Sequence, residues 1–358
     1  MAPRSASRCG LAANALLVAT ALSSTSNHLI NAPRVDAASG APLVPSPKRF
    51  GAGVAWALPQ ATRRPFDAGA PRELAWWDDA PARTIFARGG IEVAEVPAPA
   101  SPLGGSWRLL RTAGGRVVQS AGRVVDGQVH CGCLVGYTRG LGAAAFAGGA
   151  GASAALALGL GGGAVASFLA AHGPHAVTAV EVDAAVIDAA RATTAPPASV
   201  RIVEACAAAF CAAAAADAFD VVVVDVFDEA SRLPGALASP AFAADLVRIA
   251  RGAIALNVVR VTALDARDPG GDDLAAAVVA AVDARGGSAF LAPDAATENG
   301  VLFCVLDGDV DAAVAVARAG TRGKAAGLPF DAAAQLAAAT RVTPATVRGA
   351  LRALDEGG

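Results

Sequence analysis

The feature that most constrains the fold is a run of four consecutive valines at positions 221–224. An unbroken run of β-branched residues fits a strand that is buried on both faces, as the inner strands of parallel sheets are. Such a sheet needs helices on both sides, and the chain provides them by alternating strand and helix patterns. The sequence therefore predicts an α/β fold with a Rossmann-like doubly wound sheet. Further strands are predicted at 155–158, 176–182, 200–204 and 253–258, with helices at 164–171 and 184–193.

A small β module is predicted ahead of this domain, over residues 51–130. Its signals are pairs of short strand-like segments, each pair separated by turn residues that favour a hairpin. The turns are Gly89-Gly90, Gly114-Gly115 and Asp126-Gly127. The main α/β domain itself is predicted over 131–308, and residues 309–358 have a mainly helical composition.

The first 35 residues have the composition of a targeting segment. They contain arginines but no acidic residue, and an apolar stretch at 11–22 is followed by small polar residues. This pattern is typical of a secretory signal or of an organelle transit peptide, and without either the protein would stay in the cytoplasm. The apolar stretch is too short to span a bilayer. Residues 36–50, rich in Pro, Ala and Ser, are predicted to be a linker.

Composition narrows the classes of partner. The net charge is −2 and no run of basic residues occurs, which argues against a nucleic-acid partner. Among six cysteines only Cys131 and Cys133 are close in sequence, with no second pair to complete a zinc site. No metal cofactor is therefore predicted. Hydrophobic residues make up 54% of the chain, enough for a sizeable core.

A glycine-rich turn is the main signal for the predicted site. A short apolar strand ends in Gly159, Gly161 and Gly163, and a helix follows. Glycines there let a ligand approach the backbone, and the free N–H groups of the helix start point at it. Glu181 ends the next strand, where a carboxylate can hold both ribose hydroxyls, and Asp183 is near enough to share that role. The pattern serves NAD and S-adenosylmethionine equally well, so an NAD-binding oxidoreductase stays open.

More acids follow the next two strands of the sheet. Glu204, with Ala205 beside it, ends the third strand, where an acid can accept a hydrogen bond from the adenine amine. Asp225 ends the valine strand, and Asp228 follows it. The carboxyl ends of parallel strands form the edge at which open α/β folds bind ligands. Beside a sulfonium, a carboxylate there can hold an amine and take its proton, so Asp225 and Asp228 are the predicted catalytic residues.

Several pieces, in the right order, resemble the polyamine synthase family. The resemblance is closer to the spermidine synthase-like class I methyltransferases, among them the carboxyl-terminal domain of the methyltransferase-like proteins that modify translation elongation factor. It covers roughly residues 105–310. The pieces that carry it are the segments 116–120, 157–163, 180–183, 219–228 and 298–304.

The resemblance implies a role for each matching residue. Gly159, Gly161 and Gly163 would line the methionine part of S-adenosylmethionine, Glu181 would hold its ribose, and Glu204 would meet its adenine in place of the more usual Asp. Asp225 falls on the carboxylate that polyamine synthases use near the attacking amine. The implied activity is methyl transfer to an acceptor that the sequence does not name, either a protein or a small amine. Relatives often pair through such amino-terminal strands, which implies a homodimer.

Two departures separate the chain from true spermidine synthases. The family's Tyr-His-Glu stretch is replaced by Gly136-Tyr137-Thr138-Arg139-Gly140, and its Asp-Ser-Ser-Asp by Asp225-Val226-Phe227-Asp228. A diamine pocket without those acids would hold a dication poorly. Methyl transfer is therefore favoured over aminopropyl transfer from decarboxylated S-adenosylmethionine. A non-catalytic relative that binds a cofactor or a partner protein is the remaining alternative.

Overall fold

The computed structural model describes the chain in eleven segments, and only these are discussed below. The predicted targeting segment lies outside the described residues, as do most of the linker and Cys131 and Cys133. The described residues are 48–50, 53–55, 82–97, 105–112, 118–130, 136–148, 153–173, 176–228, 232–259, 269–294 and 299–356.

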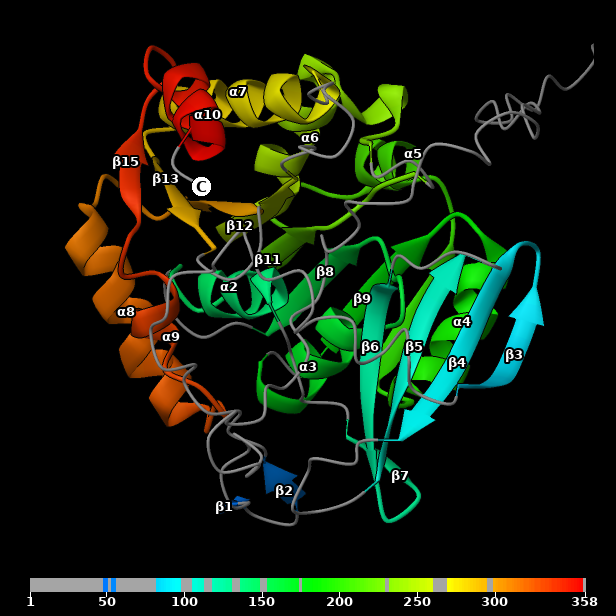
Figure 1. The fold of residues 1–358 in the computed structure, drawn as a ribbon. Helices are drawn as coiled ribbons and strands as arrows, with labels where there is room; N and C mark the ends of the chain where they lie inside the picture. The colour runs from blue at the N-terminus through cyan, green and yellow to red at the C-terminus, as the bar shows by residue number, and fades with distance from the viewer. Residues whose placement is uncertain are drawn as a thin grey trace, which may run out of the picture.

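The centre of the fold is an eight-stranded mixed sheet with the order β10-β9-β8-β11-β12-β14-β13-β15 (Figure 1). Its first five strands are parallel, and the last three are antiparallel to their neighbours. The parallel strands are β8 (Ala154–Leu158), β9 (Ala176–Glu181), β10 (Val200–Glu204), β11 (Phe219–Val224) and β12 (Ala250–Val258). The antiparallel strands are β13 (Ser288–Pro293), β14 (Gly300–Val305) and β15 (Thr340–Val342).

The valine run is buried on both faces, as predicted. Val221 and Val223 belong to one hydrophobic core, and Val222 and Val224 belong to a second core on the other face of the sheet. This division follows from the alternation of side chains along a strand. Helices that cover the first core are α2 (Tyr137–Ala144), α3 (Ala164–His172), α4 (Ala184–Thr193), α8 (Ala312–Ala325) and α9 (Ala332–Gln335). Those over the second are α5 (Ala207–Ala213), α6 (Pro240–Ile249), α7 (Pro269–Ala284) and α10 (Val347–Glu356).

The amino-terminal module is a five-stranded antiparallel sheet in chain order, which confirms the predicted β module. Ile91 and Leu110 of this sheet pack against Ala185 and Ala189 of α4, so this helix joins the module to the main domain. Figure 1 shows it beside α4, in cyan. Its strands are β3 (Arg83–Arg88), β4 (Ile91–Pro97), β5 (Ser106–Thr112), β6 (Val118–Val125) and β7 (Gln128–His130).

The carboxyl-terminal region is helical over α8, α9 and α10, and it also contributes β15. This strand pairs with β13, where Val342 lies opposite Ala289. The region therefore completes the edge of the main sheet in addition to covering it. The sequence pattern does not predict this strand, because it is only three residues long.

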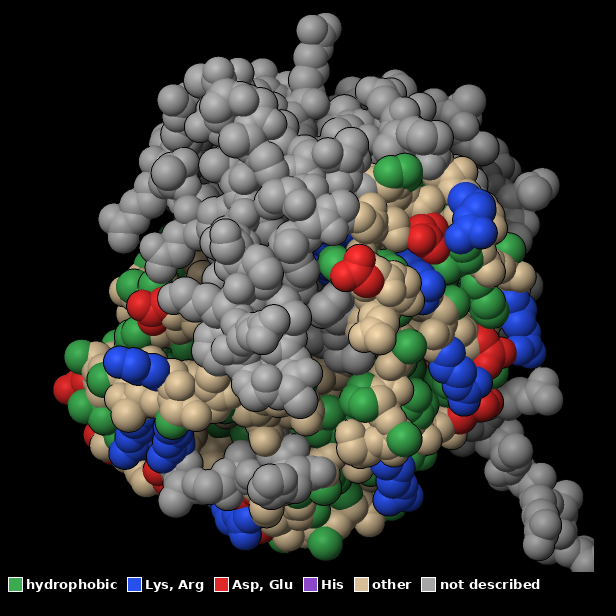
Figure 2. Space-filling model, turned by 90° about the horizontal axis from the view of Figure 1, so that it is seen from below, with side chains coloured by type: hydrophobic (Ala, Val, Ile, Leu, Met, Phe, Trp, Pro, Cys, Tyr) green, Lys and Arg blue, Asp and Glu red, His purple; other side chains and the backbone are tan. Residues whose placement is uncertain are grey.

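The described surface is mixed in charge. On the face shown in Figure 2, cationic and anionic side chains of the described residues lie interspersed. Among those residues, no helix is long and apolar enough to cross a bilayer.

Candidate active site

The glycine turn is pressed against the end of the neighbouring strand. Gly159 has a φ of +83°, and a Cβ on it would lie 2.1 Å from the carbonyl oxygen of Asp225. The Asp225 amide donates a hydrogen bond of 2.9 Å to the carbonyl of Leu158. Only glycine fits at position 159, because a side chain would meet both an unfavourable backbone angle and a backbone atom. The close approach places the turn directly beside Asp225.

The other glycines have different neighbours. Gly161 has a φ of +48°, and no described atom lies within 4 Å of a Cβ built on it. The backbone is therefore open on that side, as a ligand-binding turn requires. A Cβ on Gly162 would instead meet Ser120 Oγ of β6 at 2.5 Å. Gly163, with a φ of +81°, is the residue before the first turn of α3.

Glu181 is held firmly at the end of β9. Its Oε2 accepts a hydrogen bond from the amide of Leu160 at 3.1 Å, within the glycine turn. Its Oε1 accepts from the amides of Val182 at 2.8 Å and Asp183 at 3.1 Å. Three backbone donors thus fix the carboxylate next to the turn, which is the position predicted for a ribose ligand.

Glu204 is the neighbour of Glu181 on the next strand. The parallel register of β9 and β10 pairs these two residues, and the Ala205 amide donates to the Glu181 carbonyl at 2.9 Å. Glu204 itself is exposed. Two carboxylates therefore lie side by side at the carboxyl edge of the sheet, on the far side of the glycine turn from Asp225.

Asp225 lies in a polar pocket made by residues that are distant in sequence. Asn257 Nδ2, from β12, donates to its Oδ1 at 2.8 Å, and Tyr137 Oη, from α2, donates to its Oδ2 at 3.2 Å. Burial raises the pKa of the Asp225 carboxyl, and the two hydrogen bonds oppose that shift. The pKa of Tyr137 is raised well above its usual value by burial and by Asp225 and Asp294. Tyr137 therefore remains a protonated donor.

Comparison with known proteins finds a matching domain family and similar folds. Residues 156–239 match the family profile described as a methyltransferase domain. No curated protein matches the chain. Among solved structures, it is similar to a probable spermidine synthase from Corynebacterium glutamicum, with a TM-score of 0.53 and 17% identity over 76% of this chain and 94% of that one. The fold is therefore similar to that of a spermidine synthase, and residues 156–239 within it match a methyltransferase domain.

Two further solved structures are similar over a smaller part of the chain. One is human methyltransferase-like protein 13 in complex with SAH, with a TM-score of 0.43 and 19% identity over 55% of this chain and 95% of that one. The other is spermidine synthase from Thermotoga maritima, with a TM-score of 0.43 and 16% identity over 63% of this chain and 74% of that one.

Two predicted residues of the methyltransferase domain make contacts within their own loops. Asp183 is exposed and caps α4 by accepting a hydrogen bond from the Ala185 amide at 2.7 Å. Asp228 is also exposed, accepts a hydrogen bond from the Arg232 amide at 2.9 Å and pairs with its side chain at 3.8 Å. These contacts order the two loops. Roles of Asp183 in ribose binding and of Asp228 in catalysis stay predictions.

Three residues of the site were not predicted: Tyr137, Asn257 and Asp294. Tyr137 lies in the stretch that departs from the spermidine synthases, yet it reaches Asp225. Asn257 is a polar residue inside an apolar strand, and that was the signal that could have revealed it. It is 3% exposed, and its Oδ1 has no hydrogen-bond partner among the described residues. Asp294, after β13, acts electrostatically on Tyr137.

Some predicted pieces lie beyond the described residues. Arg116, Val117 and Glu298, which contribute to the family resemblance, are among them. Asn299 is described and buried. Within the described segments no group of three or more His, Cys, Asp or Glu side chains is arranged to hold a metal ion.

Proposed function

We propose that the chain is an S-adenosylmethionine-dependent methyltransferase of the spermidine synthase-like group, with Asp225 at the acceptor. One observation carries this proposal: the glycine turn and the half-buried Asp225 are in backbone contact. The Leu158–Asp225 hydrogen bond of 2.9 Å joins them. A donor bound along the turn and a nucleophile bound at Asp225 would be neighbours, and such alignment is the main requirement of methyl transfer.

The residues at the carboxyl edge fit the cofactor. Gly161 leaves open space beside the backbone for the methionine part. Glu181, fixed by three amides, is suited to the two ribose hydroxyls, because a rigid carboxylate with two oxygens can accept from a vicinal diol. Glu204 and Ala205, one strand further, would meet the adenine. When bound, the cofactor supplies an electrophilic methyl group.

Asp225 is suited to hold the nucleophile and to take its proton. A general base works best when its pKa lies near the operating pH, and burial moves the pKa of Asp225 in that direction. Tyr137 and Asn257 fix the orientation of the carboxylate through their two hydrogen bonds. The Asn257 Oδ1 atom is an additional acceptor without a partner among the described residues.

Aminopropyl transfer is the second candidate, and Asp294 is the observation that favours it. Asp294 acts electrostatically on Tyr137, the residue that donates to Asp225, and a cationic amine would be stabilised by a second acid on this side of the site. In this alternative the donor is decarboxylated S-adenosylmethionine. Asp225 would have the same role in both reactions, so the donor distinguishes them.

Calorimetric titration of the full chain with three ligands tests the proposal. The ligands are S-adenosylmethionine, its decarboxylated form and NAD. We expect preferential binding of S-adenosylmethionine, and a loss of at least tenfold in its affinity for Glu181→Gln, because the ribose loses a charged acceptor. The matched control is Glu95→Gln, an acid of the β module that pairs with Arg83 and Ser106. Preference for the decarboxylated form would select aminopropyl transfer, and preference for NAD would overturn both.

A further inference from the structure

A cavity of about 520 Å³ lies at the amino edge of the main sheet. Asp220 near the start of β11 and Gly252 near the start of β12 line it, whereas Asp225 follows the other end of β11. Five residues of extended strand separate Asp220 from Asp225, which is about 16 Å. The cavity is therefore distinct from the candidate active site, and its volume is within the range of small-molecule pockets.

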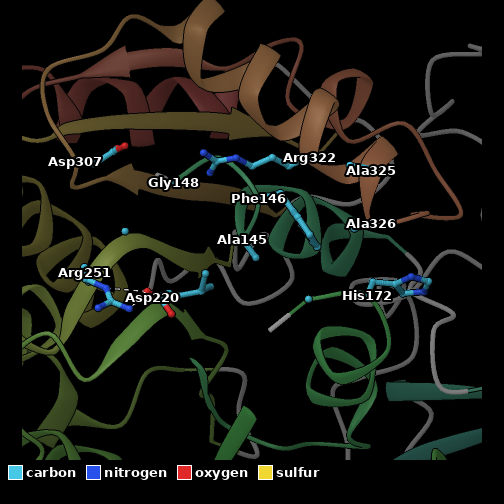
Figure 3. Close-up of a pocket in the computed structure, with 13 residues that line it drawn as sticks. Ala145, Phe146, Gly148, His172, Asp220, Arg251, Asp307, Arg322, Ala325 and Ala326 are labelled. Carbon is cyan, nitrogen blue, oxygen red and sulfur yellow. Dashed lines mark hydrogen bonds and ion pairs between the residues drawn. The ribbon is translucent and has the colours of Figure 1, made fainter. Parts of the chain in front are cut away.

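Most of the cavity wall is apolar or backbone. Phe146 and Ala145 follow α2, and Ala325 and Ala326 end α8 on the opposite side. In Figure 3 the Phe146 ring projects between the ribbon of α8 and that of α3. These small and aromatic surfaces suit the apolar body of a ligand rather than a fully hydrated ion.

His172 joins two of these walls. Its ring contacts that of Phe168 with the ring centroids 5.0 Å apart, and it is hydrogen-bonded to the backbone of Ala326. Burial lowers the pKa of His172, so the imidazole is neutral near pH 7. It closes the cavity between α3 and α8 without adding charge.

The acids of the cavity are already neutralised by the protein. Asp220 accepts from the amides of Ser153 at 2.6 Å and Ala154 at 3.0 Å, and it also pairs with Arg251. Asp307 forms an ion pair with Arg318 at 3.1 Å. Neither carboxylate is therefore available as a strong site for a cation.

The Arg251 guanidinium retains capacity for an anion. Arg251 uses Nε and Nη2 on Asp220, and its Nη1 has no partner among the described residues. This pairing holds the Arg251 guanidinium in one orientation. Arg322 reaches in from α8, from the opposite wall, as Figure 3 shows. A guanidinium held in place loses little entropy when it binds a carboxylate.

We propose that this cavity binds a small organic carboxylate. Its carboxylate group would lie between Arg251 and Arg322, and its apolar body would pack on Phe146 and Ala326. This would be a second ligand site, independent of the donor and the acceptor of methyl transfer.

Two probes with the same apolar body and different charge test the proposal. The full chain is titrated by calorimetry with 2-naphthoate and with the neutral 2-naphthamide. We expect 2-naphthoate to bind at least tenfold more tightly, because a charge-assisted hydrogen bond to arginine is lost in the amide. Equal binding of the two probes, or no binding of 2-naphthoate, would overturn the proposal.

Variants then locate the bound probe. Arg251→Gln and Arg322→Gln should each weaken 2-naphthoate about tenfold, and Ala326→Leu should block it by filling the cavity. Arg348→Gln is the matched control, since Arg348 pairs with Asp273 on the surface outside the cavity. Thermal melting reports whether each variant is folded, and Arg322→Gln and Ala326→Leu leave the Arg251–Asp220 pair intact. Unchanged binding in these two folded variants would contradict the assignment.

Discussion

Strand β11 has a carboxylate near each end, and the surrounding protein shifts the pKa values of these two carboxylates in opposite directions. At the amino end, burial of Asp220 is outweighed by the amides of Ser153 and Ala154 and by Arg251, which hold the pKa of this carboxyl at about 2. At the carboxyl end, burial outweighs two hydrogen bonds and raises the pKa of Asp225. The first is a permanently ionised structural group. The second has a raised pKa, which is the direction that the proposed role as proton acceptor requires.

The difference comes from the charge of the donors. Asp220 receives a guanidinium and several N–H groups, so ionisation is strongly favoured. Asp225 receives one amide and one phenol, both neutral. Neutral donors fix the orientation of a carboxylate but compensate only part of its desolvation. We therefore interpret the raised pKa of Asp225 beside the glycine turn as a sign of the proposed function, and the depressed pKa of Asp220 inside an ion pair as a sign of a structural role.

Asp225→Asn should give the largest effect, and it should fall on activity. We expect methyl transfer to drop by roughly two to four orders of magnitude, since the proton acceptor is lost. Binding of S-adenosylmethionine should persist, and stability at pH 7 should be unchanged or higher, because a buried ionisable group is removed. The measurement is transfer of a tritiated methyl group to a panel of amines and peptides, next to calorimetry and thermal melting. Asp228→Asn, in the exposed loop, should keep most of the activity. Equal losses of methyl-transfer activity in the two variants would contradict a special role for Asp225.

Gly159→Ala should give the largest loss of stability. A Cβ there meets the Asp225 carbonyl oxygen at 2.1 Å in a backbone of positive φ, and we expect a loss of about 3 kcal/mol or more. Gly161→Ala is the matched control, because it also has a positive φ but no described atom within 4 Å of the new Cβ. Its cost should be about 1 kcal/mol. Urea denaturation measures both, and similar losses would mean that the contact with Asp225 does not determine the need for glycine at 159.

The donor side of the site could be predicted because it is local in sequence. Each residue there follows a strand, so strand prediction alone places Gly159, Glu181 and Glu204 at one edge of the sheet. The acceptor side could not, because Tyr137 and Asn257 reach Asp225 only after α2 packs over the sheet and β12 pairs with β11. No spacing in the sequence encodes that contact.

The contacts at the amino end of β11 could not be predicted for the same reason. Asp220 precedes the valine run and carries no motif, and its partners Ser153 and Arg251 come from two other strand starts. Most strands and the fold class follow from the apolar pattern, because burial on both faces leaves a clear signal. The very short β15 leaves none, and its pairing with β13 is decided by packing of the carboxyl-terminal region.

Asp220→Asn should lower stability by about 2 kcal/mol at pH 7, which corresponds to the fall in pKa from 3.8 to about 2. Because the folded-state pKa is depressed, this contribution is present above pH 4 and is lost as the pH falls through about 2. The difference between wild type and variant should therefore shrink on acidification. Denaturation curves from pH 7 to pH 2 measure it. Asp273→Asn, which removes an exposed ion pair with Arg348, should cost far less. If the difference in stability between wild type and Asp220→Asn grew as the pH fell, the prediction would be wrong.

Asn257→Ala should give a smaller effect than Asp220→Asn, with the opposite sign of pH dependence. Removing the 2.8 Å hydrogen bond takes away the stronger donor to Asp225, so the pKa of its carboxyl should rise further. A lost hydrogen bond to a charged group corresponds to about one pH unit. The pH–rate profile of methyl transfer should move toward alkaline pH by that amount.

Tyr137→Phe should shift the pH–rate profile in the same direction by less, because its hydrogen bond of 3.2 Å is longer.

The sign for stability follows from the raised pKa of Asp225. Its favourable contribution to stability is complete below the unfolded pKa of 3.8 and is lost as the pH rises through the folded-state pKa. Acidification from neutral pH should thus reduce the contribution of Asp220 to stability. Over the same change in pH, the contribution of Asp225 to stability should increase. An acid shift of the profile in Asn257→Ala would show that Asn257 does not stabilise the ionised carboxylate of Asp225.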